Sequence, residues 1–333
     1  MLTQIIAEIG SVHDGSFGNA LKLIELAADC GASAVKFQTH ISQAETLMNA
    51  PAPSFFKGEP RYEYFIRTSF SLAQWKELKA KCDHRNIEFM SSPFSNEAVE
   101  ILEKIGMDRY KIPSGEVTNI PMLELIAQTK KTIILSSGMS TWKELDEAIE
   151  AINKFHNNII ILQCTSEYPC SFEMVGLNIM LEMKQRYNLP IGLSDHTLTN
   201  YAAYSAATLG AILIEKHLTF NRKMYGSDAK HSLEPSEFID LVSGVKAINE
   251  ILSNKLDKDL IANQMKEMKE VFQKSIVAAY DIQKGEVLKQ EHLAFKKPGT
   301  GLPANKYKSI LGLKTRTKML KDEYINMKDL EQG

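Results

Sequence analysis

Short apolar runs that end in polar or charged residues recur through the first two-thirds of the chain. Each run is rich in branched aliphatic residues, as expected of a strand buried on both faces of a parallel sheet. The pattern predicts eight strands, at Gln4–Glu8, Ser33–Thr39, Ile87–Ser92, Arg109–Ser114, Thr132–Ser136, Asn158–Cys164, Ile191–Ser194 and Ala211–Glu215.

Segments with helical periodicity separate these runs. They include Asn19–Cys30, Leu72–Arg85, Asn96–Ile105 and Thr141–Phe155. We expect Asn19 to cap the first helix, and Glu144 lies three residues after Thr141, the spacing of a capping box. Strands that alternate with helices predict right-handed βαβ units and a parallel sheet. Eight such units predict a (β/α)8 TIM barrel, and a doubly wound open sheet is the alternative, although no GxGxxG follows the first strand.

Polar side chains gather where the predicted strands end. One of them alone is equally well explained as a helix cap or a buried hydrogen bond. Together they predict one funnel at the C-terminal face of a barrel. They are Glu8, Lys36, Gln38, Ser91, Ser92, Lys111, Ser114, Glu116, Ser136, Ser137, Thr165, Ser166, Glu167, Tyr168, Ser194, Asp195, His196, Glu215, Lys216 and His217. Three lysines beside serines and glycines indicate a phosphorylated or carboxylated ligand, and two imidazoles can hold a divalent metal.

Composition narrows the class of protein. The 333 residues include 39 basic and 41 acidic side chains, which is not the footprint of a nucleic-acid-binding protein. Four cysteines without regular spacing indicate reduced thiols, and hence a cytoplasmic protein. We recognise no signal peptide, and no apolar run approaches the length of a membrane span.

The chain becomes charged and poor in aromatic residues directly after the predicted barrel. We assign residues 1–252 to the barrel, 253–271 to a charged linker and 272–333 to a small β-rich domain. Within that domain, Ile282–Leu293 aligns without gaps with Met319–Leu330, which predicts pseudo-symmetry. Earlier in the chain, Ala44–Arg67 is too long for a simple connection, so we expect a lid or a dimer contact there.

The chain resembles the sialic acid synthase family, the phosphoenolpyruvate-dependent synthases of nonulosonic acids. The matching segments are Ala7-Glu8-Ile9-Gly10, His13-Asp14-Gly15, Val35-Lys36-Phe37-Gln38-Thr39, Ser91-Ser92-Pro93-Phe94-Ser95, Lys111-Ile112-Pro113-Ser114-Gly115-Glu116, Ser136-Ser137-Gly138-Met139, Gly192-Leu193-Ser194-Asp195-His196-Thr197, Glu215-Lys216-His217 and Ser232-Leu233-Glu234-Pro235. The tail, with Pro298-Gly299-Thr300-Gly301-Leu302, looks like the antifreeze-like (SAF) domain that caps this family.

The resemblance implies a reaction and a set of residues. Phosphoenolpyruvate would condense with an open-chain N-acylated mannosamine-type sugar to give a nonulosonic acid and phosphate. The implied phosphoenolpyruvate-binding residues are Lys36, Ser92, Lys111, Ser114, Ser136, Ser166 and Ser194. The implied sugar-binding residues are Gln38, Tyr168, Glu215, Asp228 and Lys297. Glu8, Lys36, Lys111, Glu116 and Tyr168 would be catalytic, and His196 with His217 would bind one divalent cation, Mn²⁺ or Mg²⁺.

Three positions depart from the family pattern. Val12 and Ser166 stand where the family usually has asparagine, and Lys297 stands where an arginine of the cap usually reaches the sugar. Lysine keeps the charge of arginine without its bidentate fork, so the acceptor sugar stays open between N-acetylmannosamine and 2,4-diacetamido-6-deoxy sugars. The resemblance also implies a domain-swapped homodimer with no nucleic-acid or membrane partner.

Two other functions remain open from the sequence. Lys36, Lys111 and Lys216 stand at strand ends where the lysine of a Schiff-base aldolase would work. Alternatively, the chain is a non-catalytic glycan-binding module with a degenerate barrel.

Overall fold

A computed structural model describes residues 2–51 and 59–332 of the chain. The chain divides into two compact units, one ending at Ser253 and the other beginning at Asn254. Within the described residues, no helix is both long and apolar enough to cross a membrane. All four cysteines are free thiols, as predicted.

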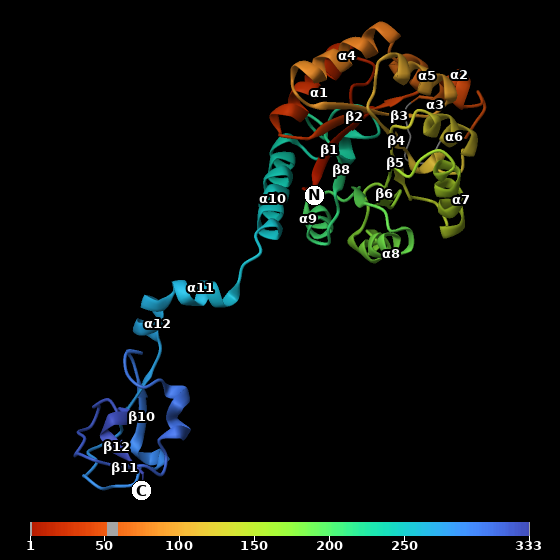
Figure 1. Cartoon of the computed structure of the whole chain (residues 1–333). Coiled ribbons are helices and arrows are strands. Elements are labelled where there is room, and N and C mark those ends of the chain that lie inside the picture. Colours follow the sequence, from red (N-terminus) through yellow and green to blue (C-terminus); the bar gives the residue numbers. More distant parts are fainter. Residues whose placement is uncertain (1, 52–58, 333) are drawn as a thin grey trace. The chain divides into compact units, whose positions relative to one another are not determined.

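The first unit is built around a closed barrel of eight parallel strands (Figure 1). These strands are β1 (Gln4–Gly10), β2 (Ala34–Thr39), β3 (Glu88–Pro93), β4 (Arg109–Ile112), β5 (Thr132–Ser136), β6 (Ile159–Cys164), β7 (Ile191–Asp195) and β8 (Leu213–His217). Each strand pairs with the next along the chain, and β1 closes the barrel against β8. The predicted (β/α)8 barrel is therefore confirmed, and the open-sheet alternative is wrong.

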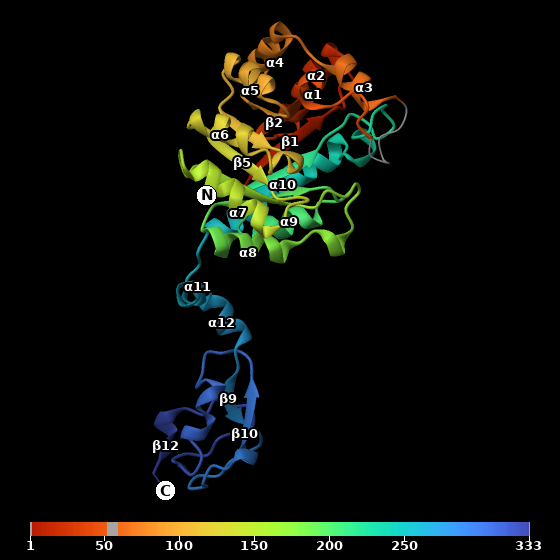
Figure 2. The same cartoon turned by 90° about the vertical axis from the view of Figure 1, so that its right-hand side faces the viewer.

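Helices surround the barrel, as the second view shows (Figure 2). They are α1 (Phe17–Asp29), α4 (Leu72–His84), α5 (Asn96–Lys104), α6 (Ile120–Gln128), α7 (Trp142–Asn153), α8 (Leu177–Tyr187), α9 (Tyr201–Thr208) and α10 (Pro235–Ser253). The capping box predicted for Thr141 and Glu144 is confirmed at the start of α7. Asn19 was the wrong cap for α1: Ser16 is the N-cap, and its hydroxyl accepts from the Asn19 amide. The helix begins one turn early because Ser16 offers an acceptor at the right spacing.

The long connection after β2 forms two further helices, α2 (Ser42–Glu45) and α3 (Arg61–Thr68). Tyr64 and Phe65 of α3 are buried, and the Ser42 hydroxyl donates to the Tyr62 carbonyl at 2.9 Å. The two helices are thus tied to each other. Part of the lid or dimer contact predicted for this segment falls on residues 52–58, which lie outside the described residues.

The barrel is filled at one end only. A cluster of buried apolar side chains comes from the N-terminal and middle parts of the strands, namely Ile6, Ala34, Met90, Ile134, Ile160, Leu162 and Leu213. A larger cluster packs the outer faces of the strands against the helices. Because the N-terminal end is closed by these aliphatic side chains, a ligand can enter only at the C-terminal ends of the strands.

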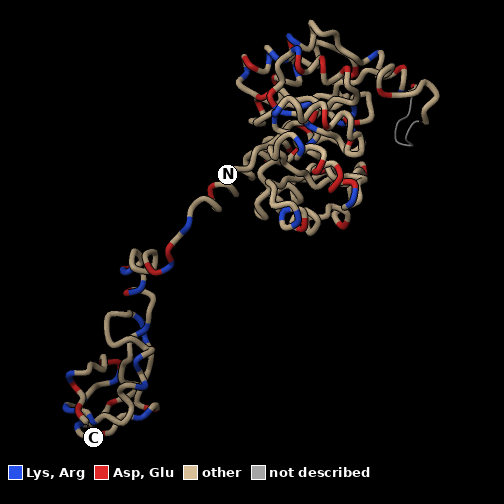
Figure 3. The backbone as a smooth tube through the Cα atoms, turned by 45° about the vertical axis from the view of Figure 1, so that its right-hand side comes forward, with Lys and Arg blue, Asp and Glu red and all other residues tan. Residues whose placement is uncertain are grey.

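The second unit begins with two short helices, α11 (Lys258–Gln264) and α12 (Lys266–Phe272), within the segment predicted to be a linker. Both carry acidic and basic residues (Figure 3). The remainder holds two antiparallel pairs, formed by β9 (Ser275–Ala278) with β10 (Leu293–Lys296) and by β11 (Lys314–Thr315) with β12 (Leu330–Glu331). Its separate core includes Ile276, Ile282 and Leu288.

The predicted internal repeat of this unit is confirmed by the backbone. Ile282 and Met319, the first residues of the two copies, form an antiparallel bridge with each other. The third residues after them, Gly285 and Asp322, both adopt positive φ, at +84° and +69°. Both copies therefore turn at the same position, which glycine and aspartate tolerate better than most residues.

Candidate active site

A cavity of about 450 Å³ opens at the C-terminal ends of the barrel strands. Its wall is formed by strand-end residues together with residues of α3 and of the loops that follow the strands. It contains thirteen of the side chains predicted for the site, namely Glu8, Lys36, Gln38, Lys111, Ser114, Ser136, Ser166, Tyr168, Ser194, His196, Glu215, His217 and Asp228. Sequence reasoning therefore located the funnel and most of its wall.

Strand alternation decides which polar side chains reach this cavity. Glu215 and His217 of β8 line the wall, whereas Lys216 between them does not. Lys216 is buried on the outer side of the barrel, where its Nζ donates to Asp195 Oδ2 at 2.6 Å. The prediction of three lysines in one pocket is thus wrong, because successive side chains of a strand point to opposite faces. The third cation in the wall is Arg61 of α3.

Two lysines and two glutamates interlock in the floor of the cavity. Lys36 Nζ lies 2.8 Å from Glu8 Oε2 and 3.6 Å from Glu215 Oε2. Lys111 Nζ lies 3.6 Å from Glu215 Oε1. All four side chains are buried. Buried charges need such partners, because an isolated one would lose its hydration without compensation.

The pKa values of these groups follow from burial and pairing. Burial raises the pKa of Glu8, and Lys36 only partly opposes this effect. Burial disfavours the charged form of Glu215 as well, but Lys111 and Lys36 outweigh it and lower the pKa of Glu215 to about 2. Burial lowers the pKa of Lys111, whereas in Lys36 the two glutamates prevail over burial and raise the pKa. Glu215 is therefore the fixed negative charge between the two lysines.

Hydroxyl groups complete the surroundings of the lysines. Lys36 Nζ donates to Ser92 Oγ at 3.2 Å, and Lys111 Nζ donates to Ser136 Oγ at 2.7 Å. The Ser194 hydroxyl donates to Glu215 Oε1 at 2.9 Å. Lys36 thus contacts both a serine and a carboxylate at hydrogen-bond distance, whereas Lys111 donates to Ser136 and lies at ion-pair distance from Glu215.

Gly138 lies directly against two hydroxyls of the cavity wall. A Cβ at this position would lie 2.5 Å from Ser114 Oγ and 2.6 Å from Ser166 Oγ. The close approach of this backbone to two hydroxyls makes a small polar concavity of the kind that suits an anion.

His196 and His217 also line the cavity, with ring centroids 5.7 Å apart. His196 Nδ1 lies 2.7 Å from the Thr165 carbonyl, which can only accept, so Nδ1 carries the hydrogen and Nε2 keeps its lone pair. Burial lowers the pKa of His196 to about 3, which keeps the ring neutral. His217 Nδ1 is buried without a hydrogen-bond partner among the described residues.

These two imidazoles fit a divalent cation, since neutral rings with available nitrogens are metal ligands. Glu8 is the register partner of His217 on the neighbouring strand β1. In the described part of the chain, no group of three or more His, Cys, Asp or Glu side chains is arranged to hold a metal. The protein donors alone would therefore leave several positions of a bound cation to water or substrate oxygen.

Asp228 reaches the cavity from the segment after β8. Its Oδ2 accepts from both the amide and the hydroxyl of Ser11 at 2.8 Å. Burial acts to raise the pKa of Asp228, but His217 and the hydrogen bonds from Ser11 lower it overall. Gly10 has φ +51°, and a Cβ there would lie 2.4 Å from Asp228 Oδ2. Only glycine lets Asp228 take this place.

Three predicted residues lie elsewhere. Ser92 is buried behind Lys36 rather than in the cavity wall. Glu116 is absent from the wall, and its Oε2 accepts from Asn119 Nδ2 at 2.8 Å. Lys297 belongs to the second unit, where its Nζ lies 4.9 Å from the centroid of the Phe272 ring.

The wall also contains residues to which sequence reasoning assigned no specific role. They include Arg61 and Phe65 of α3, His40 after β2 and Phe94 after β3. The positions of Arg61 and Phe65 depend on how α3 folds over the barrel, which no local pattern predicts.

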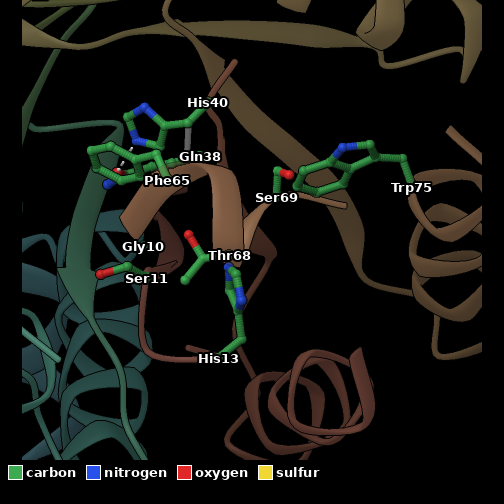
Figure 4. Close-up of a pocket in the computed structure, with 9 residues that line it drawn as sticks. All are labelled: Gly10, Ser11, His13, Gln38, His40, Phe65, Thr68, Ser69 and Trp75. Carbon is green, nitrogen blue, oxygen red and sulfur yellow. Dashed lines mark hydrogen bonds between the residues drawn. The ribbon is translucent and has the colours of Figure 1, made fainter. Parts of the chain in front are cut away.

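A second, much smaller cavity lies beside the first (Figure 4). It has a volume of about 10 Å³ and shares Ser11, Gln38, His40 and Phe65 with the large cavity. That volume is enough for one water molecule, so it is not a second ligand site.

A closed (β/α)8 barrel with a charged cavity at its C-terminal end has the architecture of a barrel enzyme. The chain belongs to the NeuB family, whose sequence model matches residues 23–257, and a SAF domain matches residues 273–331. This confirms the family and the cap domain predicted from the sequence.

Relatives of known name cover nearly the whole chain. An N,N'-diacetyllegionaminic acid synthase of Campylobacter jejuni is 38% identical over 96% of this chain and 98% of its own. A pseudaminic acid synthase of Helicobacter pylori is 31% identical over 99% of this chain and 98% of its own. Among solved structures, an N-acetylneuraminic acid synthetase of Leptospira borgpetersenii is 31% identical with a TM-score of 0.72, covering 81% of this chain and 92% of its own.

Proposed function

We propose that this chain condenses phosphoenolpyruvate with an open-chain N-acylated mannosamine-type sugar to give a nonulosonic acid and phosphate. The methylene carbon of the enol double bond forms a bond to the aldehyde carbon, and the aldehyde oxygen takes up a proton. Water adds at the carbon that carries the phosphate ester, and the C–O bond to phosphate breaks. Relatives named as legionaminic, pseudaminic and N-acetylneuraminic acid synthases support this reaction.

The observation that carries the proposal is the pairing of Lys36 and Lys111 around Glu215 in the cavity floor. With Glu8, the four groups have no net charge when all are ionised, so the lysines are held in place before a ligand arrives. A phosphate that enters can accept hydrogen bonds from both ammonium groups at little cost in reorganisation. Ser114, Ser136, Ser166 and Ser194 offer further donors, and Ser92 positions Lys36 from behind.

The acceptor sugar would occupy the side of the cavity that holds Gln38, Tyr168 and Asp228. Amide, phenol and carboxylate groups together offer both donors and acceptors to the hydroxyl groups of a sugar. Glu8 connects this side to the lysines, because it accepts from Gln38 Nε2 and pairs with Lys36. Glu116 remains our candidate for handling the attacking water.

A divalent cation fits the pair His196 and His217, and we propose Mn²⁺ or Mg²⁺. When bound, it would polarise the sugar aldehyde as a Lewis acid. It would also add positive charge to the cavity floor, where the charges of the two lysines and the two glutamates cancel. Soft, tightly held Zn²⁺ is less suitable, because only two nitrogen ligands come from the protein. Thr165 orients the ring of His196 through its carbonyl, as is usual for metal-binding imidazoles.

Lys297 of the SAF domain would act on the barrel of a second copy in a homodimer. The family resemblance supports this arrangement, in which a cap delivered by a partner excludes water from the reacting carbon.

Release of inorganic phosphate tests the proposal. Phosphate should form from phosphoenolpyruvate only when a divalent cation and an acceptor sugar are both present. The acceptors to compare are N-acetylmannosamine and the two 2,4-diacetamido-6-deoxy sugars that would lead to legionaminate and pseudaminate. Sugar-independent phosphate release, or none with any acceptor, would contradict the proposal.

Borohydride separates this reaction from the Schiff-base alternative. Reduction in the presence of pyruvate would label an aldolase covalently and leave the synthase unlabelled. Lys216 is already unsuited to that role, since Asp195 and the carbonyls of Thr197 and Thr199 occupy its ammonium group.

A further inference from the structure

A chain of hydrogen bonds leads from Glu8 through Gln38 to His40 and Glu45, two residues to which the proposed mechanism gives no role. Gln38 Nε2 donates to Glu8 Oε1 at 2.7 Å, and Gln38 Oε1 lies 3.1 Å from His40 Nε2. His40 Nδ1 in turn lies 2.8 Å from Glu45 Oε1. Figure 4 shows the link between Gln38 and His40, with the His40 ring against Phe65.

The direction of each hydrogen bond can be derived from the Glu8 end. Both oxygens of Glu8 face donors, the Gln38 amide nitrogen and the Lys36 ammonium at 2.8 Å. With its nitrogen turned toward Glu8, the Gln38 amide must turn its oxygen toward His40. An oxygen of an amide only accepts, so His40 Nε2 carries a hydrogen.

Two protonation states of the His40–Glu45 pair agree with a hydrogen on His40 Nε2. A carboxylate at Glu45 can accept from Nδ1 of an imidazolium, or a protonated carboxyl can donate to Nδ1 of a neutral ring. Either state leaves a hydrogen on Nε2. The other oxygen of Glu45 accepts from the Ile41 amide at 3.2 Å, which fixes the carboxyl group.

Aromatic side chains around His40 prevent these hydrogen bonds from rearranging. The His40 ring lies between Phe65 and Phe94, at centroid distances of 3.6 and 4.0 Å, with both pairs close to parallel. The side chains of His40 and Glu45 are 7% and 4% exposed. The ring cannot exchange its two nitrogens without leaving this stack.

We infer that His40 and Glu45 are positioning residues for the reaction, because they hold the Gln38 amide in the orientation that presents its nitrogen to Glu8. If His40 Nε2 lost its hydrogen, the amide would turn over and place its oxygen against the Glu8 carboxylate. The inference rests on the proposed function, in which Glu8 and Gln38 serve the acceptor sugar. It assigns no contact with phosphoenolpyruvate to His40 or Glu45.

Two substitutions at Glu45 form a matched pair. In Glu45→Gln, the new amide nitrogen can donate to His40 Nδ1 while its oxygen still accepts from Ile41, so Nε2 keeps its hydrogen. In Glu45→Leu, nothing holds that tautomer. We expect Glu45→Gln to keep kcat within about threefold of wild type and Glu45→Leu to lose about 10- to 100-fold, the usual effect of a misplaced catalytic group. The KM for phosphoenolpyruvate should change less than about twofold in both.

His40→Phe provides a second variant that can still stack between Phe65 and Phe94 but has no donor. It should lose kcat to a similar extent while its thermal unfolding midpoint stays near that of wild type. Wild-type kcat in His40→Phe, or equal losses in Glu45→Gln and Glu45→Leu, would overturn the inference.

A measurement without substrate keeps the inference separate from the proposed function. Nitrogen-15 spectra of the histidine rings should show His40 protonated at Nε2 in the wild-type protein. A neutral ring protonated only at Nδ1 would overturn the inference. If the wild-type protein formed no product with any acceptor, the proposed function would fail. The spectrum would still decide the direction of the hydrogen bonds from Glu8 to Glu45.

Discussion

Lys216 and Asp195 form a buried ion pair directly behind the cavity wall, with Nζ and Oδ2 2.6 Å apart. Each residue is flanked by neighbours that line the cavity, Glu215 and His217 on β8, Ser194 on β7 and His196 directly after it. The two residues are also register partners in the sheet. The pair therefore joins the two strands at the point where both candidate metal ligands emerge.

The ion pair predicts a large loss of stability on single substitution. Lys216→Met would leave the Asp195 carboxylate buried without its partner, and we expect unfolding in urea to show a loss of about 3–5 kcal/mol. The double variant Lys216→Met with Asp195→Asn should recover part of that loss, because no unpaired charge remains. Lys143→Met, which breaks an exposed pair with Glu147, is the control and should change nothing measurable. A Lys216→Met protein as stable as the control would show that the pair is not needed.

The two histidines predict dependence on a metal. His196→Ala or His217→Ala should abolish turnover and Mn²⁺ binding, measured by electron paramagnetic resonance, while circular dichroism stays unchanged. His84→Ala, on the exposed surface of α4, is the control. Full activity after exhaustive chelation would exclude a catalytic metal.

Lys111 predicts a selective effect on one substrate. Lys111→Ala removes a charged partner that we place at the phosphate, and the loss should be on the order of 2–5 kcal/mol. Steady-state kinetics should show it as a raised KM for phosphoenolpyruvate, with a much smaller change for the sugar. Equal changes in both constants would instead assign Lys111 a structural role.

Protonation of the buried His13 should destabilise the folded protein in acid. Burial lowers the pKa of His13 to about 4, against an ordinary value of 6.5. Between these values the unfolded chain binds the proton that the folded protein excludes, so stability rises with pH through this window and falls as pH drops from 6.5 toward 4. The contribution is about 3 kcal/mol. Urea unfolding at pH 4.5 and 7 should show a smaller difference in His13→Gln than in wild type, and equal differences would contradict the assignment.

Lys297 predicts complementation between two inactive proteins. If the cap acts on the partner's barrel, mixed dimers of Lys297→Glu and His196→Ala contain one site with both lesions and one site with neither. Random pairing should then restore about a quarter of wild-type activity. Verified mixed dimers without activity would mean that each cap serves its own barrel.

The sequence by itself determined the strands, the barrel and the end of the barrel that holds the site. This was possible because the signals are local: apolar runs set each strand, caps such as Thr141 set helix starts, and the ends of parallel strands meet on one face. The repeat in the second unit was also readable, since Gly285 and Asp322 mark the same turn.

Tertiary structure decided which polar groups share a surface. Lys216 faces away from the cavity because side chains alternate along β8, so that Lys216 lies on the other face of the strand from Glu215 and His217. The sequence contains this alternation, but our prediction of three lysines in one pocket did not take it into account. Arg61 and Glu45 reach the site or its surroundings because the long connection after β2 folds into helices beside the barrel. Contacts of this kind depend on packing between distant segments, so the chain from Glu8 to Glu45 becomes visible only when those segments are folded together.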